Sequence, residues 1–217
     1  MKYNKFIQIS CDGGAATGKS TGAKMISKKY KLKFLSSGLL YRYAGYLILK
    51  FKPKNKIVFL RKKFKKLNYN KLSKINLHTQ EISNYSAVIA KENKIRKILK
   101  IFQINFSKKN KNCCIEGRDI STKILPNSDL KFFFKCNLSV AAKRRYKELK
   151  KSNAKIKLKD VKKSLKIRNI LDTKRKNSPL LKHRDSVEID TGKLSKQAML
   201  AKMSKYVEKI LNIKYGI

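Results

Sequence analysis

The chain contains little that would indicate a membrane protein, an exported protein or a metal centre. No apolar run within its 217 residues approaches the roughly 20 residues that a membrane-spanning helix needs. The first residues, 1–5, show no signal peptide, so we expect a cytoplasmic protein. None of the cysteines has C-x-x-C spacing and neither histidine lies near one, which predicts reduced thiols and no zinc site at Cys11, Cys113, Cys114 and Cys136.

Acidic residues are also scarce, because 13 Asp and Glu face 56 Lys and Arg, for a net charge of +43. Such a charge attracts nucleic acid non-specifically through the phosphate backbone. The lysines are spread along the whole chain instead of forming a tail or a stripe, which favours compositional drift toward Lys, Asn and Ile over a dedicated nucleic-acid site. We therefore expect only non-specific contact with nucleic acid, and a field that attracts nucleotides.

One stretch matches the phosphate-binding pattern G-x-x-x-x-G-K-[ST] at every fixed position. A strand-like alternation at 6–9 precedes it, and apolar residues at helical spacing follow it at Ala23, Ile26 and Tyr30. Strand, glycine-rich loop and helix are the context that this motif requires. The predicted phosphate loop consists of Gly13, Gly14, Ala15, Ala16, Thr17, Gly18, Lys19 and Ser20.

The chemistry of this loop follows from its residue types. Glycines let backbone N–H groups approach an anion, and the following helix adds the positive end of its dipole. Lys19 brings a positive charge to the β- and γ-phosphates, and the Ser20 hydroxyl is a ligand for Mg²⁺. The motif predicts a nucleotide phosphate but not a particular reaction.

Further along the chain, strands alternate with helices. We expect strands at 32–35, 113–115, 130–134 and 187–189. We expect helical structure at about 37–49 and over 79–106, and a helix followed by loops within 51–76. A helix capped by Ser139 follows the strand at 130–134. Another helix runs from about Lys159 and places along one side Val161, Leu165, Arg168, Asp172 and Arg175. Ser195 caps the last helix. The alternation predicts a parallel sheet, whose ligands bind at the carboxyl ends of its strands.

Several short motifs occur in the order found in bacterial-type cytidylate kinases. They are 12–20, Ser37-Gly38 with Tyr41-Arg42, Ile95-Arg96, 116–119, 144–149, Arg168 with Asp172 and Arg175, Pro179-Leu180 and 189–191. Only the phosphate loop is specific alone, but the ordered set covers nearly the whole chain, and the chain therefore resembles this family.

The resemblance implies a fold and an activity. The fold would be an α/β phosphate-loop kinase of three α/β/α layers with a parallel five-stranded sheet, forming one domain over 1–217 with an acceptor-binding segment at about 37–106 and a lid at about 145–178. The activity would be transfer of the γ-phosphate of ATP to CMP or dCMP with Mg²⁺, carried out by a monomer. Besides the loop, Thr21 and Arg144 would bind ATP.

The resemblance also implies roles for the remaining site residues. Ser37, Arg96 and Asp119 would contact the cytosine, whose N4 amino group is a donor that suits a carboxylate and a hydroxyl. Asp172 would hold the ribose hydroxyls. Phosphoryl transfer needs positioning and charge neutralisation, and the residues that would carry it are Lys19, Arg118, Arg168 and Arg175. Arg42 would join the arginines in holding the acceptor phosphate.

The chain departs from the family pattern in three places. Gly14 and Ala16 stand where the family often has proline and glycine inside the loop. Asn169, Ile170 and Leu171 replace a charged stretch, so one arginine of the family's lid has no counterpart. The β-rich insertion that family members carry is reduced to a few residues between Phe64 and His78. Two alternatives remain: a related kinase acting on UMP or on a small-molecule hydroxyl, and a basic phosphate-loop protein that binds RNA.

Overall fold

The computed structural model describes residues 6–150 and 155–216, in two compact units. The first, here called the sheet unit, comprises Met1–Leu35 and Asn110–Ile217, and the second, the helical unit, comprises Ser36–Lys109. Residues 1–5, for which we expected no signal peptide, and residues 151–154 of the expected lid lie outside the described residues. The helical unit nearly coincides with the expected acceptor-binding segment, and the single-domain organisation stays a prediction.

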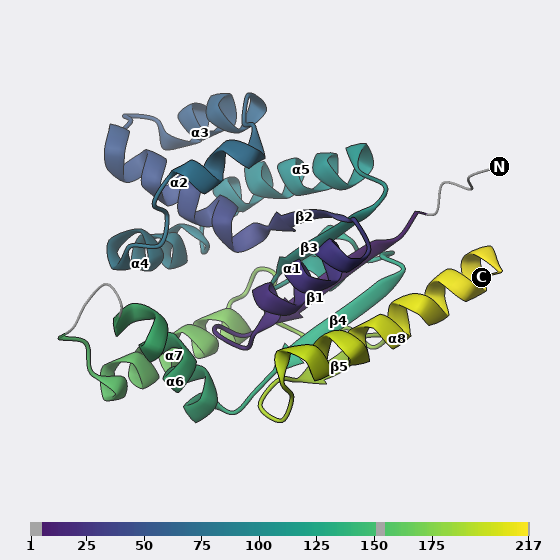
Figure 1. Ribbon diagram of the computed structural model, residues 1–217. Coiled ribbons are helices and arrows are strands. Elements are labelled where there is room, and N and C mark those ends of the chain that lie inside the picture. The colour runs from purple at the N-terminus through teal and green to yellow at the C-terminus, as the bar shows by residue number, and fades with distance from the viewer. Residues whose placement is uncertain (1–5, 151–154, 217) are drawn as a thin grey trace. The chain divides into compact units, whose positions relative to one another are not determined.

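A five-stranded parallel sheet flanked by helices forms the centre of the sheet unit, which confirms the expected fold class (Figure 1). The strand order is β2-β3-β1-β4-β5. The central strand β1 pairs in parallel with β3 and β4, and β4 pairs in parallel with β5. The bounds are β1 Gln8–Gly13, β2 Lys33–Ser36, β3 Cys113–Gly117, β4 Leu130–Lys135 and β5 Val187–Asp190.

The first strand differs from the expectation, which placed it at 6–9. It runs to Gly13, whose partner in β4 is Phe134. Polar and apolar residues alternate through Asp12, but Ser10, Asp12 and Gly13 are residue types common in turns, so the expectation ended the strand before them although Ser10 and Asp12 are fully buried. Gly13 is therefore both the last residue of the central strand and the first residue of the phosphate loop.

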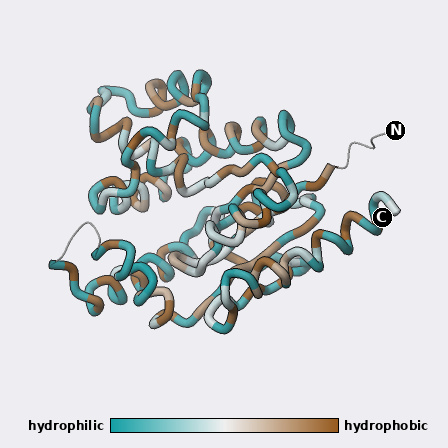
Figure 2. The backbone as a smooth tube through the Cα atoms, in the orientation of Figure 1, coloured by the Kyte–Doolittle hydropathy of each residue, from teal (hydrophilic) through white to brown (hydrophobic). Residues whose placement is uncertain are grey.

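Helices α1 (Lys19–Lys29) and α8 (Lys196–Tyr215) pack on one another and share an apolar core with the sheet. Hydrophobic residues, brown in Figure 2, run along the strands and the inner sides of these helices. Ser195 accepts a hydrogen bond from the Ala198 N–H at 3.1 Å, which confirms it as the cap of α8. The fully buried members of this core include Ile9, Ile26, Phe132, Phe134, Met203 and Val207.

Helices α6 (Leu138–Lys150) and α7 (Leu158–Lys174) pack against each other after β4. Ser139 is not the cap of α6, because the helix begins before it and the Asn137 side chain accepts the Ser139 N–H at 2.8 Å. Arg175 is not on α7 but just beyond it, with extended backbone. A short π-helical turn, η2 (Ile120–Ile124), follows β3.

The helical unit contains α2 (Ser37–Phe51), α3 (Lys56–Lys65), α4 (Gln80–Ile89) and α5 (Asn93–Lys109). Between α3 and α4 the structure has only a 3₁₀ turn, η1 (Tyr69–Lys74), and no strand, in keeping with a reduced insertion. Ile95, Ile98 and Leu99 are buried and lie on the apolar face of α5.

None of the helices within residues 6–150 and 155–216 is long and apolar enough to cross a membrane. All four cysteines are free thiols, three of them buried in β1 and β3. Within 6–150 and 155–216 no group of three or more His, Cys, Asp or Glu is arranged to hold a metal ion.

The close contact between α1 and the sheet generates a first prediction, for which Gly22→Ala and Gly38→Ala form a matched pair. A Cβ at Gly22 would lie 2.7 Å from the Phe134 ring and 3.2 Å from Met203 Sδ. Overpacking a rigid core costs about 1–3 kcal/mol, more than the about 1 kcal/mol gained in helix propensity. Gly22→Ala should therefore lower the free energy of unfolding.

In contrast, a Cβ at Gly38 meets nothing closer than Ser36 Oγ at 3.8 Å, so Gly38→Ala should keep or raise stability. Urea unfolding of both variants measures the difference. Equal effects of the two substitutions would show that α1 does not pack this tightly on β4.

Candidate active site

The phosphate loop has three residues in the left-handed backbone region, and only two of them are glycines. Gly18 has φ 78° and Gly13 has φ 155°, where a Cβ would lie 2.4 Å from the Phe134 carbonyl oxygen. Ala16 has φ 57°, a conformation that costs a residue with a Cβ about 1–2 kcal/mol. The loop is therefore strained at Ala16, where the family often has glycine.

Lys19 lies at the start of α1 and is only 6% exposed, and its amine forms an ion pair with the buried carboxylate of Glu116 at the end of β3. Burial lowers the pKa of the Lys19 amine, and the charge and hydrogen bond of Glu116 oppose this. The loop lysine and an acid near the end of a neighbouring strand are thus in direct contact.

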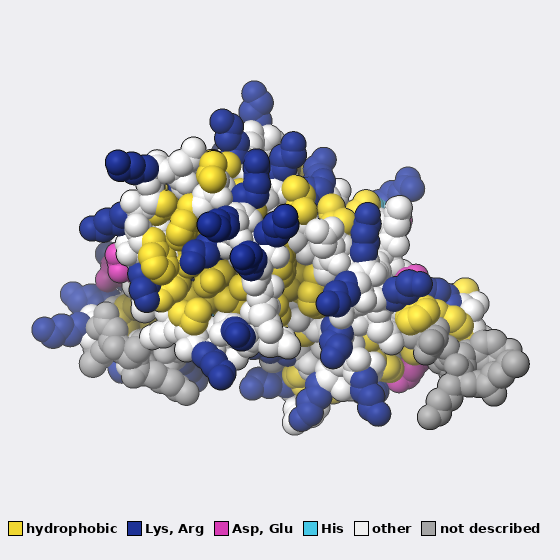
Figure 3. Space-filling view, turned by 90° about the horizontal axis from the view of Figure 1, so that it is seen from above, with side chains coloured by type: hydrophobic (Ala, Val, Ile, Leu, Met, Phe, Trp, Pro, Cys, Tyr) yellow, Lys and Arg dark blue, Asp and Glu magenta, His cyan; other side chains and the backbone are white. Residues whose placement is uncertain are grey.

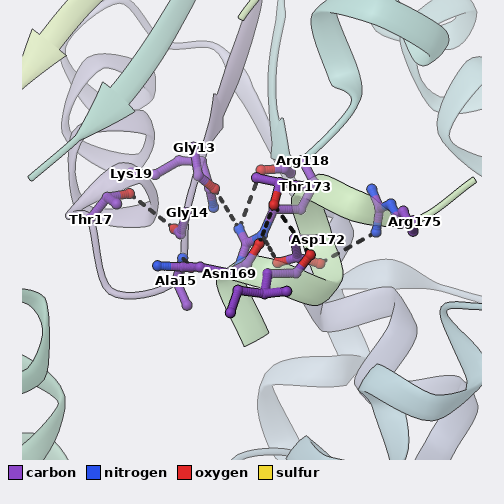
Figure 4. Close-up of polar contacts among 12 residues, drawn as sticks. Gly13, Gly14, Ala15, Thr17, Lys19, Arg118, Asn169, Asp172, Thr173 and Arg175 are labelled. Carbon is purple, nitrogen blue, oxygen red and sulfur yellow. Dashed lines mark hydrogen bonds and ion pairs between the residues drawn. The ribbon is translucent and has the colours of Figure 1, made fainter. Parts of the chain in front are cut away.

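Arg118 connects the phosphate loop to helix α7 (Figure 4). Its Nη1 donates to the Gly13 carbonyl at 2.8 Å, and its Nε donates to Asp172 Oδ2 at 2.7 Å. Arg175 contacts the other oxygen of Asp172, Oδ1, at 3.4 Å. The carboxylate therefore lies between two guanidinium groups beside the loop.

These cations determine the ionisation of Asp172. Burial alone would raise its pKa, but the guanidinium of Arg118 and the positive charges of Arg168 and Arg175 outweigh burial and lower the pKa. Asp172 is consequently a carboxylate at neutral pH. The expected cluster of Arg118, Arg168, Asp172 and Arg175 is brought together by the sheet unit, beside Gly13.

The sequence pattern gave no role to Asn169, which it marked only as a departure from the family. In the structure Asn169 Oδ1 accepts the Ala15 N–H at 3.3 Å, so α7 touches the loop directly (Figure 4). A Cβ at Gly14 would lie 3.2 Å from the same oxygen. In the sequence, the only indication that Asn169 belongs to the site was its position three residues before Asp172, which places both on the same helix face.

Thr191 is a second residue whose role was not foreseen, although its motif was part of the resemblance. Its hydroxyl donates to the Thr17 carbonyl at 2.7 Å and accepts from Arg144 Nη1 at 2.8 Å. Arg144 Nη2 also donates to the Thr191 carbonyl at 2.7 Å. Arg144, expected to bind ATP, is therefore attached to the loop through the residue that follows β5.

The turn after β3 carries Arg118 and Asp119, and it is tied to β1 through Asp12. The Asp12 carboxylate is fully buried and accepts from Ile120 N at 2.8 Å, Ser121 N at 2.7 Å and Ser121 Oγ at 2.6 Å. Burial raises the pKa of Asp12 and these hydrogen bonds lower it, with a net rise. Asp119 is also buried, at 5% exposure, at the start of η2.

Three of the expected acceptor-binding residues belong to the helical unit. Ser37 is the first residue of α2 and is buried. Arg42 Nη1 is 2.9 Å from His78 Nδ1. Arg96 donates to the Ala90 carbonyl at 3.1 Å, and its guanidinium lies 5.7 Å from the centre of the Tyr41 ring. Their expected contacts with cytosine and phosphate stay predictions.

Ser20 and Thr21 begin α1 and are exposed, so their hydroxyls are accessible from solvent. Mg²⁺ takes oxygen ligands, and in phosphate-loop proteins most of these come from the nucleotide and water. A single exposed hydroxyl at the motif position fits a metal that arrives with its nucleotide, and the expected role of Ser20 as a Mg²⁺ ligand stays a prediction.

Comparisons with known proteins agree with the ordered motifs. The sequence model described as "Cytidylate kinase" matches residues 9–209. A cytidylate kinase of Bartonella tribocorum is 34% identical over 210 residues, covering 94% of this chain and 96% of that protein. A cytidylate kinase of Mesomycoplasma hyopneumoniae is 34% identical over 223 residues, covering 95% of each.

Solved structures share the fold at lower identity. An uncharacterized protein from Eubacterium ventriosum has a TM-score of 0.54 at 16% identity, covering 94% of this chain and 99% of that one. The protein TT1252 from Thermus thermophilus has a TM-score of 0.53 at 13% identity, covering 95% and 98%. At this identity the likeness concerns the fold alone.

The strain at Ala16 generates a second prediction. Ala16→Gly should raise the free energy of unfolding by about 0.5–1 kcal/mol, because glycine adopts a positive φ without a steric penalty. Ala15→Gly is the matched control: Ala15 is buried against Ala141 and Val161, has no positive φ, and should lose stability. Chemical denaturation measures both, and a loss at both positions would contradict the strain.

The buried pair of Lys19 and Glu116 generates a third prediction. Lys19→Met removes the ammonium group that compensates the buried Glu116 carboxylate and should cost about 3–5 kcal/mol of unfolding free energy, besides abolishing phosphoryl transfer. Adding Glu116→Gln removes that charge and should restore more than half of the stability without restoring activity. Urea unfolding and a kinase assay on both variants measure these effects. Equal stability of the single and double variants would contradict a buried pair.

Proposed function

The chain belongs to the cytidylate kinase family, and from that premise we propose that it transfers the γ-phosphate of ATP to CMP or dCMP, giving ADP and CDP or dCDP. The observation that supports this most directly is the Arg118 bridge from Gly13 to Asp172. It places guanidinium groups and a carboxylate next to the loop that binds nucleotide phosphates, where a second nucleotide needs its phosphate neutralised and its ribose held.

The phosphoryl transfer itself requires little covalent chemistry from the protein. Charge on the transferred group is spread over its oxygens, so catalysis depends on cations that are already in position. We assign this task to Lys19, Arg118, Arg168 and Arg175, and the binding of the acceptor phosphate also to Arg42. Mg²⁺ held by Ser20 and the phosphates would neutralise further charge.

The cytosine would be recognised by Asp119, Ser37 and Arg96. A carboxylate accepts a hydrogen bond from the N4 amino group of cytosine and repels the O4 carbonyl of uracil. The burial of Asp119 supports this assignment, because a buried hydrogen-bonding site rejects an incorrect partner more strongly than an exposed one. We also expect the enzyme to act as a cytoplasmic monomer.

The charge distribution supports the kinase over an RNA-binding protein. Lys and Arg side chains are scattered over the face in Figure 3, with hydrophobic and neutral surface between them and few acids. Non-specific attraction of RNA through such a surface weakens steeply with salt. Weak RNA binding with a steep salt slope, together with turnover of CMP, is therefore the expected combination.

The decisive experiment measures ADP release from ATP with CMP, dCMP, UMP, AMP, GMP or buffer alone. We expect CMP and dCMP to be the preferred acceptors, and Lys19→Met serves as the control for a contaminating kinase. Equal turnover of UMP and CMP would favour the UMP/CMP-type alternative. No turnover of any nucleotide, together with tight RNA binding, would contradict the proposal.

A fourth prediction concerns the selectivity for cytosine. Asp119→Ala should lower kcat/KM for CMP by about 10–100-fold and for UMP much less, because only the CMP complex loses a buried hydrogen bond worth about 1–3 kcal/mol. Ser37→Ala should act in the same direction more weakly. Steady-state kinetics with both acceptors measure the ratio. An equal loss for both acceptors would assign Asp119 to structure or catalysis instead of base recognition.

A further inference from the structure

Asp12 is a buried carboxylate to which the proposed reaction gives no role. It lies one residue before the end of the central strand β1, is 0% exposed, and pairs in register with Gly117 of β3. Its carboxylate accepts three hydrogen bonds from residues 120–121, at 2.6–2.8 Å. The Asp12 carboxylate, inside a central strand, is therefore hydrogen-bonded to the turn at 120–121.

That turn lies directly after the two residues on which recognition and catalysis depend. Arg118 precedes it and donates to the carbonyl of Gly13, the residue next to Asp12, at 2.8 Å. Asp119 lies in the chain between Arg118 and Ile120, whose N–H donates to the Asp12 carboxylate. Two adjacent residues of β1 thus hold the segment 118–121 at both of its ends.

We propose that Asp12 is a positioning residue for the acceptor site, an inference that rests on the proposed function. Its carboxylate fixes the backbone conformation of 120–121 and so the directions in which Arg118 and Asp119 point. Both carboxylate oxygens are used, Oδ1 by Ile120 N–H and Oδ2 by the N–H and the hydroxyl of Ser121. Charged acceptors form shorter and stronger hydrogen bonds than neutral ones, and a fixed turn places a base-reading group more precisely than a mobile one.

The substitution that tests this is Asp12→Asn, which keeps the size of the side chain but replaces one acceptor oxygen by an NH₂ donor. That donor would face the N–H of Ile120 or of Ser121, which is also a donor, and the turn must shift. We expect kcat/KM for CMP to fall by about tenfold or more, because small misplacements of catalytic groups cost large factors in rate. The CMP-to-UMP ratio of kcat/KM should fall at least about threefold, since Asp119 is displaced.

Ser121→Ala removes only one of the three hydrogen bonds and is a second variant in case Asp12→Asn does not fold. It should shift the ratio in the same direction by a smaller factor. The control is Ser10→Ala, on the same strand: Ser10 is buried and accepts from Ser128 Oγ at 2.9 Å, away from Arg118 and Asp119. Ser10→Ala should lower the thermal midpoint and leave the CMP-to-UMP ratio unchanged.

A readout independent of turnover separates this proposal from the proposed function. Hydrogen exchange at the amides of Ile120 and Ser121 should be faster in Asp12→Asn and Ser121→Ala than in the wild type, and unchanged in Ser10→Ala. If the wild type does not phosphorylate CMP, the proposed function fails, and the exchange result still decides whether Asp12 holds the turn. Unchanged exchange, or an unchanged CMP-to-UMP ratio in a folded Asp12→Asn or Ser121→Ala variant, would overturn the positioning role.

Discussion

Three carboxylates with little exposure hold a strongly cationic site together: Asp12, Glu116 and Asp172. The chain carries a net charge of +43, so cations gathered around a phosphate loop would repel one another without nearby acids. Glu116 pairs with Lys19, Asp172 lies between Arg118 and Arg175, and Asp12 holds the turn that carries Arg118. These few acids therefore orient the cations beside the phosphate loop.

The parallel sheet is what brings the acids and cations together. Because the strands run in one direction, the segments after β1, β3 and β5 leave the sheet at the same edge. The phosphate loop follows β1, Arg118 follows β3, and Thr191 follows β5. Helix α7 then contributes Asn169 and Asp172 from outside the sheet, so the loop is held from the sheet edge and from the expected lid helix.

Several features of the fold could be predicted from local patterns, and the errors have identifiable causes. The helix positions and four of the five strands follow the expected periodicity to within a few residues. The predicted end of β1 was wrong because Ser10, Asp12 and Gly13 are residue types common in turns, although here they belong to a buried strand. The prediction that Ser139 caps α6 was wrong because Asn137, two residues earlier, is an equally good acceptor for a helix N-terminus.

The phosphate loop, the family and the residue types of the site could be inferred from the amino-acid sequence, because these depend on the order and spacing of residues along the chain. The pairings between the site residues could not be inferred in this way. Lys19 and Glu116 are 97 residues apart, and Arg118 and Asp172 are 54 apart. Such contacts depend on strand order and on the packing of α7, which no local period encodes, and for the same reason the roles of Asp12, Asn169 and Thr191 appear only in the folded chain.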